Sequence, residues 1–248
     1  MHLLKIVAPW GGWILLFLLT WHLREHLLFR IDSWFPLTSQ SARWEQIVQA
    51  RTASLRDTPW QDERPLILML GDSQVEMGNW YDLFQGRFAV RNAGLSQAKI
   101  KDVSSLANGI SPIHPAMVLL FCGINDLGTG RTSDDTLKDY FQLLDQVCGD
   151  VARDRVMVLS IMPVARRRLA DGSKDLNAKV QVLNANLRQH CEKEGIAFVD
   201  VSPAISNDGM LREDLTSDGL HLNPQGYHQL AASMQPPLLR LYDKAGRK

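Results

Sequence analysis

The sequence has no excess of charge of either sign and little cysteine. The first argues against nucleic-acid binding, and the second argues against a cysteine-based metal or redox site. Lysine plus arginine and aspartate plus glutamate both number 27 in the 248 residues, so the formal net charge is zero. A nucleic-acid-binding domain normally carries a basic excess, so we expect no nucleic-acid partner. Cys122, Cys148 and Cys191 form neither a metal-ligand spacing nor a CxxC pair. We expect them to be small buried apolar residues.

The chain also lacks internal repeats and low-complexity segments. Its length and 45% hydrophobic content are enough for one core of ordinary single-domain size. We divide it into a membrane anchor at residues 1–23, a juxtamembrane linker at 24–64 and a globular domain at 65–248. Apolar residues at helical spacing within 41–55 predict that the linker is partly helical.

The first segment has the composition of a membrane-spanning helix. Residues 6–23 contain no Asp, Glu, Lys or Arg, and at about 1.5 Å per residue they reach about 27 Å, enough for the core of a bilayer. We expect a single-pass anchor; a signal peptide cleaved near Ser39, or a buried or interfacial helix, are the alternatives. The short tail before the run favours a cytoplasmic N-terminus and a globular domain on the outer, periplasmic or extracytoplasmic side.

From residue 65 onward, short apolar runs alternate with segments of helical periodicity. Five runs are typical of buried parallel strands, at 65–70, 87–94, 116–123, 155–163 and 196–202. Helical patterns cover 133–151 and 175–195, and a last helix should begin near Pro224 and stop or kink before Pro236–Pro237. Strands that alternate with helices predict a parallel sheet covered on both faces, which is a doubly wound α/β domain.

Polar and reactive residues follow these strands. The first strand runs into Ser73, the second ends at Gly94, the third is followed by Asn125, and Asp218 and His221 lie beyond the fifth. In open α/β sheets, chemistry gathers outside the carboxyl ends of the strands. We therefore expect these five residues to converge.

Each of the five has a chemical role that suits its residue type. The hydroxyl of Ser73 is a weak nucleophile until a base such as His221 takes its proton. Asp218 can accept a hydrogen bond from the other ring nitrogen and so orient the imidazole. Attack on an ester carbonyl develops an oxyanion, which the backbone N–H groups of Ser73 and Gly94 and the side-chain amide of Asn125 could stabilise.

In this order the motifs resemble those of the SGNH, or GDSL, hydrolases, which are named for Ser, Gly, Asn and His. The matching blocks are Ser73 in Gly-Asp-Ser, Gly94 in Asn-Ala-Gly, Asn125 in Gly-Ile-Asn-Asp and His221 in Asp-Gly-Leu-His. One position departs from the pattern, because Gln74 stands where the family name has leucine. The resemblance covers residues 65–241.

The resemblance implies a flavodoxin-like three-layer α/β/α fold with a five-stranded parallel sheet. It also implies esterase, lipase or deacetylase activity and a triad of Ser73, His221 and Asp218, with no metal or organic cofactor. We expect a carboxylic ester as substrate, with a short acyl or O-acetyl group carried by a small molecule, a glycan or a lipid. The alternatives are an acyltransferase that transfers the acyl group to a glycan, and a catalytically inactive binding module.

Three arginines and two aspartates have weaker signals. Arg166, Arg167 and Arg168 follow the fourth strand, on the side where the site should open, and could hold an anionic part of the substrate. A solvated basic loop is the simpler explanation for them. Asp72 should fix the turn at the nucleophile by hydrogen bonding, and Asp126 should be structural in the same way.

Overall fold

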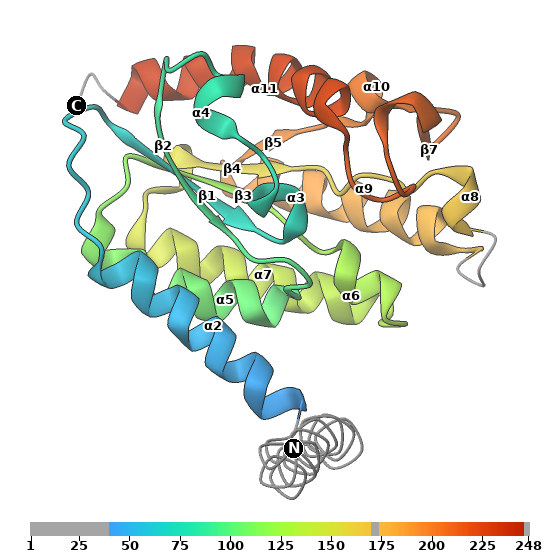
Figure 1. Ribbon diagram of the computed structural model, residues 1–248, viewed down its shortest axis with the longest axis horizontal. Coiled ribbons are helices and arrows are strands. Elements are labelled where there is room, and N and C mark those ends of the chain that lie inside the picture. Colours follow the sequence, from blue (N-terminus) through green and yellow to red (C-terminus); the bar gives the residue numbers. More distant parts are fainter. Residues whose placement is uncertain (1–39, 170–173, 246–248) are drawn as a thin grey trace, which may run out of the picture. The chain divides into compact units, whose positions relative to one another are not determined.

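The computed structural model describes residues 40–169 and 174–245, and five of its strands form one parallel sheet in the order β2-β1-β3-β4-β5 (Figure 1). The strands are β1 (Leu66–Gly71), β2 (Ala89–Gly94), β3 (Met117–Phe121), β4 (Val156–Leu159) and β5 (Ala197–Val199). A separate antiparallel pair is made of β6 (Ser206–Asn207) and β7 (Met210–Leu211). The predicted five-stranded parallel sheet is confirmed.

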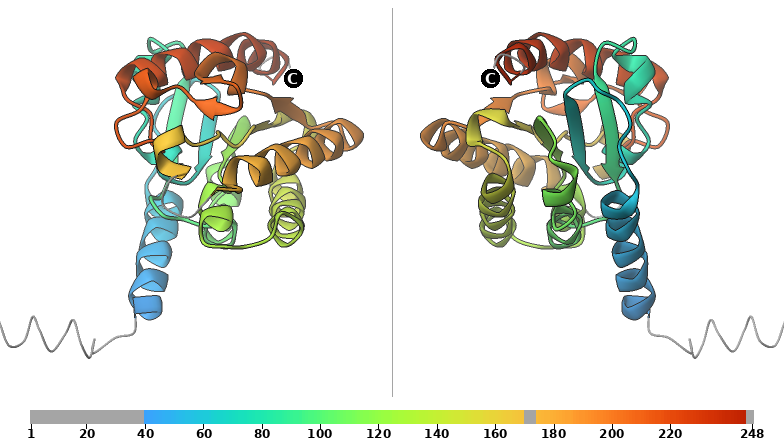
Figure 2. Two further views of the ribbon diagram at one scale, coloured as in Figure 1. Left: turned by 90° about the vertical axis from the view of Figure 1, so that its right-hand side faces the viewer. Right: turned by 90° about the vertical axis from the view of Figure 1, so that its left-hand side faces the viewer.

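Helices cover both faces of this sheet, which confirms the three-layer architecture (Figures 1 and 2). On one face lie α5 (Ile100–Ala107), α7 (Ser133–Asp150) and α9 (Leu176–Glu194). On the other face lie α4 (Trp80–Leu83), α10 (Ser202–Ile205) and α11 (Pro224–Ala245). Short helices at strand ends are α3 (Ser73–Glu76), α6 (Ile124–Gly128) and α8 (Arg166–Leu169). Three 3₁₀ turns complete the connections, at Ser111–Ile113, Arg153–Arg155 and Glu213–Leu215.

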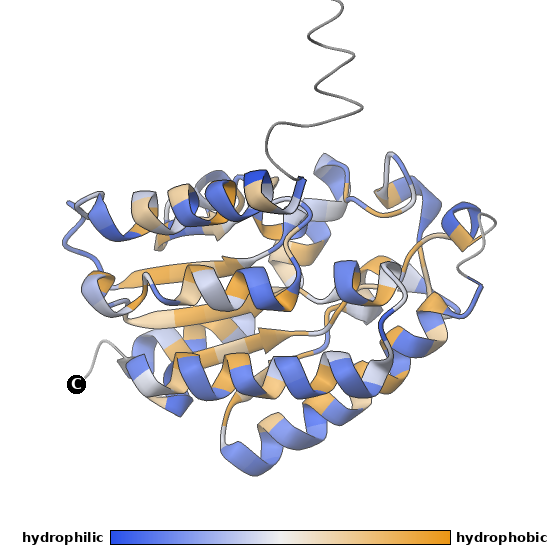
Figure 3. Ribbon diagram, turned by 90° about the horizontal axis from the view of Figure 1, so that it is seen from below, coloured by the Kyte–Doolittle hydropathy of each residue, from blue (hydrophilic) through white to orange (hydrophobic). Residues whose placement is uncertain are grey.

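The central strands are buried along their whole length. Every residue of β1 and β3 is buried, because helices remove both sets of alternating side chains from water. The strands are accordingly apolar in Figure 3, whereas the helices carry polar residues beside the apolar ones. Gly71 pairs with Gly94 on one side and with Phe121 on the other. The segments that follow these three strands therefore start level with one another, at one edge of the sheet.

Helix α11 does not stop before Pro236 and Pro237, which was one of the two predicted outcomes, but continues through them to Ala245. Each proline removes a backbone hydrogen bond and clashes with the preceding turn, at a cost of about 3 kcal/mol. Met234 and Leu238, on either side, are completely buried. Packing of these side chains against the sheet domain opposes the cost of the prolines.

Helix α2 (Gln40–Asp57) confirms that the predicted linker is partly helical. From Val48 onward, the chain forms one compact unit that includes the sheet. Val48 and Leu55 are buried, and the guanidinium of Arg51 donates a 2.7 Å hydrogen bond to the carbonyl of Asn92 on β2. The compact unit therefore begins inside the predicted linker, before residue 65, because the second half of α2 packs on it.

Among the described residues, no helix is long and apolar enough to cross a membrane. The anchor predicted at residues 1–23 lies outside the described residues and stays a prediction. The cysteines are free, and Cys122 and Cys191 are buried while Cys148 is partly buried. In the described ranges, no group of His, Cys, Asp and Glu side chains is arranged to hold a metal ion.

Candidate active site

The structure brings together Ser73 and His221, which lie far apart in the sequence. Ser73 begins α3 directly after β1, and His221 lies in the loop before α11. The Oγ atom of Ser73 is 3.0 Å from Nε2 of His221, and Nδ1 of His221 is 2.7 Å from Oδ2 of Asp218. A neutral imidazole that donates from Nδ1 to the carboxylate presents the lone pair of Nε2 to the hydroxyl. This is the geometry that a Ser-His-Asp triad requires.

The nucleophile's turn is held by the buried carboxyl group of Asp72. Its Oδ1 accepts a 2.9 Å hydrogen bond from the backbone N–H of Gln74 and caps α3. Burial raises the pKa of Asp72 to about 7, and the nearby Asp126 contributes to the rise, while backbone hydrogen bonds from Gln74 and Gly123 oppose it. Asp72 therefore fixes the turn by hydrogen bonding, as the sequence analysis expected.

The carboxylate of Asp218 lies in a more open place, with about half of the side chain exposed. Oδ1 accepts hydrogen bonds from the backbone N–H groups of Leu220 at 2.9 Å and His221 at 2.8 Å. Partial burial acts to raise the pKa of Asp218, but these two bonds and the bond from the imidazole of His221 outweigh it and lower the pKa to about 2. The carboxylate is therefore ionised at any ordinary pH and can orient the imidazole.

The loop that carries Asp218 and His221 depends on residues that the sequence analysis did not single out. The hydroxyl of Thr216 donates to the carbonyl of His221 at 2.6 Å and accepts from the N–H of Gly219 at 3.0 Å. Gly219 has a φ of +86°, which glycine adopts without strain. Its carbonyl accepts a 2.8 Å hydrogen bond from the N–H of Ala165, after β4. The Thr-Ser-Asp-Gly sequence, rich in turn-forming residues, was the available signal for this loop.

Two of the three predicted oxyanion donors have N–H groups to offer. In the described part of the chain, the backbone N–H of Ser73 makes no hydrogen bond. The side-chain amide of Asn125 uses one hydrogen in a 2.9 Å bond to the carbonyl of Ala98, which leaves its second hydrogen for a ligand. The neighbouring Asp126 is structural, because its Oδ2 accepts the N–H of Ile100 at the start of α5 at 2.9 Å.

Gly94 has a different role from the predicted one. Its backbone N–H already donates to Oδ1 of Asn92 at 2.9 Å. A Cβ atom on Gly94 would lie 2.2 Å from the backbone nitrogen of Glu76, so glycine is required because β2 approaches α3 closely. The structure thus gives this glycine a packing function, and its N–H is engaged within the protein.

Gln97, in the loop between β2 and α5, offers a further backbone donor. Its φ is +67°, and its N–H makes no hydrogen bond to any described residue. The carbonyl of the next residue, Ala98, holds the side chain of Asn125, so the loop lies beside one of the predicted donors. A glycine would have marked this left-handed position in the sequence, and glutamine gives no such signal.

The three arginines lie on α8, next to the histidine loop. A Cβ atom on Gly219 would be 3.3 Å from Cγ of Arg167 and 3.2 Å from Cβ of Arg168, so α8 packs on this loop. The guanidinium of Arg167 forms a 2.7 Å salt bridge with Glu213. Arg166 instead lines a polar pocket of about 270 Å³ with residues 207–214. Binding of an anionic substrate by these arginines stays a prediction.

An open pocket of about 380 Å³ lies between the α3–α4 segment and the start of α11. Its walls are partly apolar and partly polar, formed by Met77, Asn79, Asp82, Leu83, Leu222, Pro224, Tyr227 and His228. Met77 ends the helix that Ser73 begins, and Leu222 directly follows His221. Both walls of this pocket therefore come from segments that also carry a residue of the triad.

Comparison with known proteins assigns the sequence around these motifs to a family. Residues 69–229 match the family described as GDSL-like Lipase/Acylhydrolase. Among curated proteins, an N-acylneuraminate cytidylyltransferase from Streptococcus agalactiae serotype III (strain NEM316) is 24% identical over 172 residues. That match covers 68% of this chain but only 37% of the relative.

Solved structures share the fold at low sequence identity. A GDSL-like lipase from Bacteroides thetaiotaomicron VPI-5482 has a TM-score of 0.66 and 19% identity, over 78% of this chain and 97% of the other. A carbohydrate esterase family 3 protein from Talaromyces cellulolyticus has a TM-score of 0.55 and 18% identity, over 72% and 98%. Since the family match spans well over half of the sequence, this chain belongs to the GDSL-like lipase/acylhydrolase family and is a hydrolase of the SGNH type.

Proposed function

We propose that this hydrolase cleaves a carboxylic ester through an acyl-enzyme formed on Ser73. His221 takes the proton of the hydroxyl as Oγ attacks the ester carbonyl, and then gives the proton to the leaving alkoxide. A water molecule attacks the acyl-enzyme with His221 again as base, which releases the acid and restores Ser73. The observation that carries this proposal is the continuous contact from Ser73 to His221 at 3.0 Å and on to Asp218 at 2.7 Å.

The charge on the carbonyl oxygen needs donors that are in place before the reaction. The N–H of Ser73, the second amide hydrogen of Asn125 and the N–H of Gln97 support this step, because none of the three is used within the described protein. Gly94 is left out of this set, since its N–H is bound to Asn92.

We propose a short acyl group, with the rest of the substrate a sugar or another polar alcohol. The open pocket beside the triad supports this, because it combines Met77 and Tyr227 with the polar groups of Asn79, Asp82 and His228. An aromatic wall with hydrogen-bonding groups suits a sugar better than a long alkyl chain. The fold shared with a carbohydrate esterase agrees with this substrate class.

The test replaces the nucleophile and varies the ester. Ser73→Ala should abolish hydrolysis of nitrophenyl acetate and labelling by a fluorophosphonate, while its circular dichroism stays unchanged. Ser233→Ala is the matched control, because that hydroxyl only donates to the carbonyl of Leu230 on α11. A series of nitrophenyl esters should show kcat/KM falling as the acyl chain lengthens beyond acetyl, and acetylated glycans should be deacetylated.

Three outcomes would change the proposal. Undiminished turnover by Ser73→Ala would remove the serine mechanism. Faster turnover of octanoyl than acetyl esters would exclude the short acyl group. Transfer of the acetyl group to an added glycan, at the expense of hydrolysis, would make the protein an acyltransferase.

We also propose that residues 6–23 anchor the enzyme in a membrane, with its catalytic domain on the outer side. The support is the uncharged apolar run, which is long enough for a bilayer. The full chain should remain with membranes after a carbonate wash, and alkaline phosphatase fused after Lys248 should be active. An inactive fusion, with a cytoplasmic reporter active at the same place, would put the domain inside.

A further inference from the structure

We propose that Gln74 is a positioning residue that joins the nucleophile's helix to the histidine loop and so sets the distance between Ser73 and His221. The inference rests on the proposed serine mechanism. It adds to that mechanism a residue other than the Ser, Gly, Asn and His for which the family is named. Gln74 directly follows the nucleophile, at the position where the family name has leucine.

The side chain of Gln74 makes the connection directly. It is 3% exposed, and its Nε2 donates a 2.9 Å hydrogen bond to the carbonyl of Leu220, the residue before His221. The backbone carbonyl of Gln74 accepts a second bond, at 2.9 Å, from the buried hydroxyl of Tyr227 on α11. The residue next to the nucleophile is thus bound on two sides to the segment that carries the base.

Other contacts of the loop do not replace this connection. Asp218 and Thr216 make hydrogen bonds within the loop, and Ala165 joins it to the segment after β4. These bonds fix the shape of the loop but not its distance from α3. In the described part of the chain, Gln74 makes the only hydrogen bonds between α3 and this segment apart from the Ser73–His221 pair itself.

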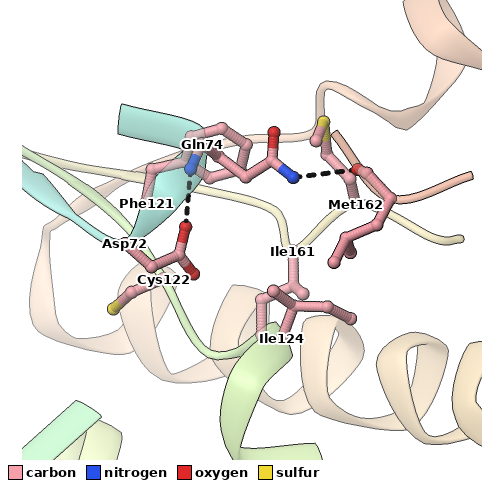
Figure 4. A pocket seen from close by; sticks show the side chains of 8 residues that line it. Asp72, Gln74, Phe121, Cys122, Ile124, Ile161 and Met162 are labelled. Carbon is pink, nitrogen blue, oxygen red and sulfur yellow. Dashed lines mark hydrogen bonds between the residues drawn. The ribbon is translucent and has the colours of Figure 1, made fainter. Parts of the chain in front are cut away.

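Within the described residues, the amide of Gln74 uses its donor nitrogen in a hydrogen bond but not its acceptor oxygen. Oε1 of Gln74 is buried without a hydrogen-bond partner among the described residues. Gln74 also lines a cavity of about 10 Å³ with Asp72, Cys122 and Leu220 (Figure 4), and this cavity has room for about one water molecule. The orientation of the amide follows from Leu220, because a carbonyl oxygen only accepts hydrogen bonds.

The first test is Gln74→Met, which keeps the length of the side chain and removes the donor. Because His221 would lose its fixed distance to Ser73, kcat should fall about 10- to 100-fold with KM unchanged. Gln146→Met is the matched control, since Gln146 also donates from Nε2 to a backbone carbonyl, that of Ser104, on the opposite face of the sheet. It should lose stability without losing kcat.

The second test is Gln74→Glu, which makes the donor depend on pH. A protonated carboxyl group can still donate a hydrogen bond to the carbonyl of Leu220. The ionised carboxylate cannot donate, and it is repelled by the partial negative charge of that carbonyl oxygen and by the nearby carboxyl group of Asp72. Cys122 and Tyr227 also surround this position, and His221 lies beyond Leu220. Activity of this variant should therefore fall as the pH rises, a loss that Gln74→Met does not show.

The third readout does not depend on any ester. The proton on Nδ1 of His221 should give a downfield resonance in the wild type because it is bonded to Asp218. In Gln74→Met, this resonance should broaden or disappear as the loop loses its fixed position. It should persist in Gln146→Met.

The outcomes separate the two proposals. Wild-type kcat and an unchanged downfield resonance in Gln74→Met would overturn the positioning role. If the wild type neither hydrolyses esters nor reacts with a fluorophosphonate, but its resonance still depends on Gln74, then the proposed function fails and the positioning role stands.

Discussion

Asp72 and Asp218 each lie within a few residues of a triad partner, yet their carboxyl groups differ in ionisation. Burial raises the pKa of Asp72 to about 7, beside a nucleophile that is itself only 4% exposed. The pKa of Asp218 is lowered to about 2, because hydrogen bonds from Leu220 and His221 outweigh the effect of its partial burial. The same side chain thus caps a helix on the buried side and acts as a fixed negative charge on the open side.

The difference shows that the two halves of the site are held by different means. Ser73 is placed by buried strands and by α3, so its position depends on the packing of the whole sheet. His221 is placed by hydrogen bonds within a partly exposed loop and by the link from Gln74. Changes in the histidine loop should therefore reduce activity more than stability, and changes that disturb only the packing around the sheet should do the reverse.

The largest effect should come from Asp218→Asn, on the open side. The variant keeps the shape of the side chain but loses the charge that holds the imidazole in the productive tautomer. We expect kcat to fall by about 10⁴-fold, as in other triads, with little change in the urea midpoint. A large loss of stability with normal activity per folded molecule would contradict the comparison.

Removal of α2 tests the buried side. A chain that begins at Thr58 lacks Val48 and Leu55, whose burial contributes about 1.5–3 kcal/mol each, and the bond from Arg51 to β2. It should be about 3–5 kcal/mol less stable to urea than a chain that begins at Gln40. Ile47→Ala, at an exposed position of the same helix, is the control and should change little.

Asn125→Ala lies between these cases, because Asn125 offers one amide hydrogen to the substrate and uses the other in the fold. Loss of one oxyanion donor should lower kcat by about 10²–10³-fold. The stability loss should be small, about 1 kcal/mol for the bond to Ala98. A change confined to KM would instead assign Asn125 to binding of the ground state.

The effect that depends most on pH, and least on the reaction itself, should come from Asp72→Asn. Because the folded-state pKa of Asp72 is raised to about 7, the native protein keeps a proton there that the unfolded chain loses near pH 4. Its contribution to stability is therefore complete below about pH 4, falls by on the order of 1.4 kcal/mol per pH unit, and is gone above about pH 7. Urea unfolding from pH 4 to 8 should lose this slope in the variant, and Asp134→Asn on the exposed start of α7 should keep it.

The same pair of variants assigns the pH dependence of activity. Asp218 stays ionised from pH 4 to 8, since its pKa is about 2, so it cannot cause a loss of activity in this range. We expect kcat/KM to fall on acidification, because a general base must be free to accept the proton of Ser73. Asp72→Asn should retain that loss, and its disappearance in the variant would assign it to Asp72 instead.

The sequence by itself determined the order of strands and helices and the residues of the proposed triad. Apolar runs such as 65–70 and 116–123 and the Asp-Gly-Leu-His block are local patterns, and parallel strands place their carboxyl ends at one edge of the sheet. The convergence of Ser73, Asp218 and His221 therefore follows from local patterns combined with one rule of sheet topology.

Only the tertiary structure decided features that depend on contacts between distant segments. The need for glycine at position 94 follows from how closely β2 approaches α3, because a Cβ atom there would lie 2.2 Å from the backbone nitrogen of Glu76. The continuation of α11 through its prolines and the inclusion of the second half of α2 in the compact unit follow from packing within that unit. The link from Gln74 to Leu220 and the opposite pKa shifts of the two aspartates arise in the same way, because burial and hydrogen bonding are set by neighbours that the local sequence does not name.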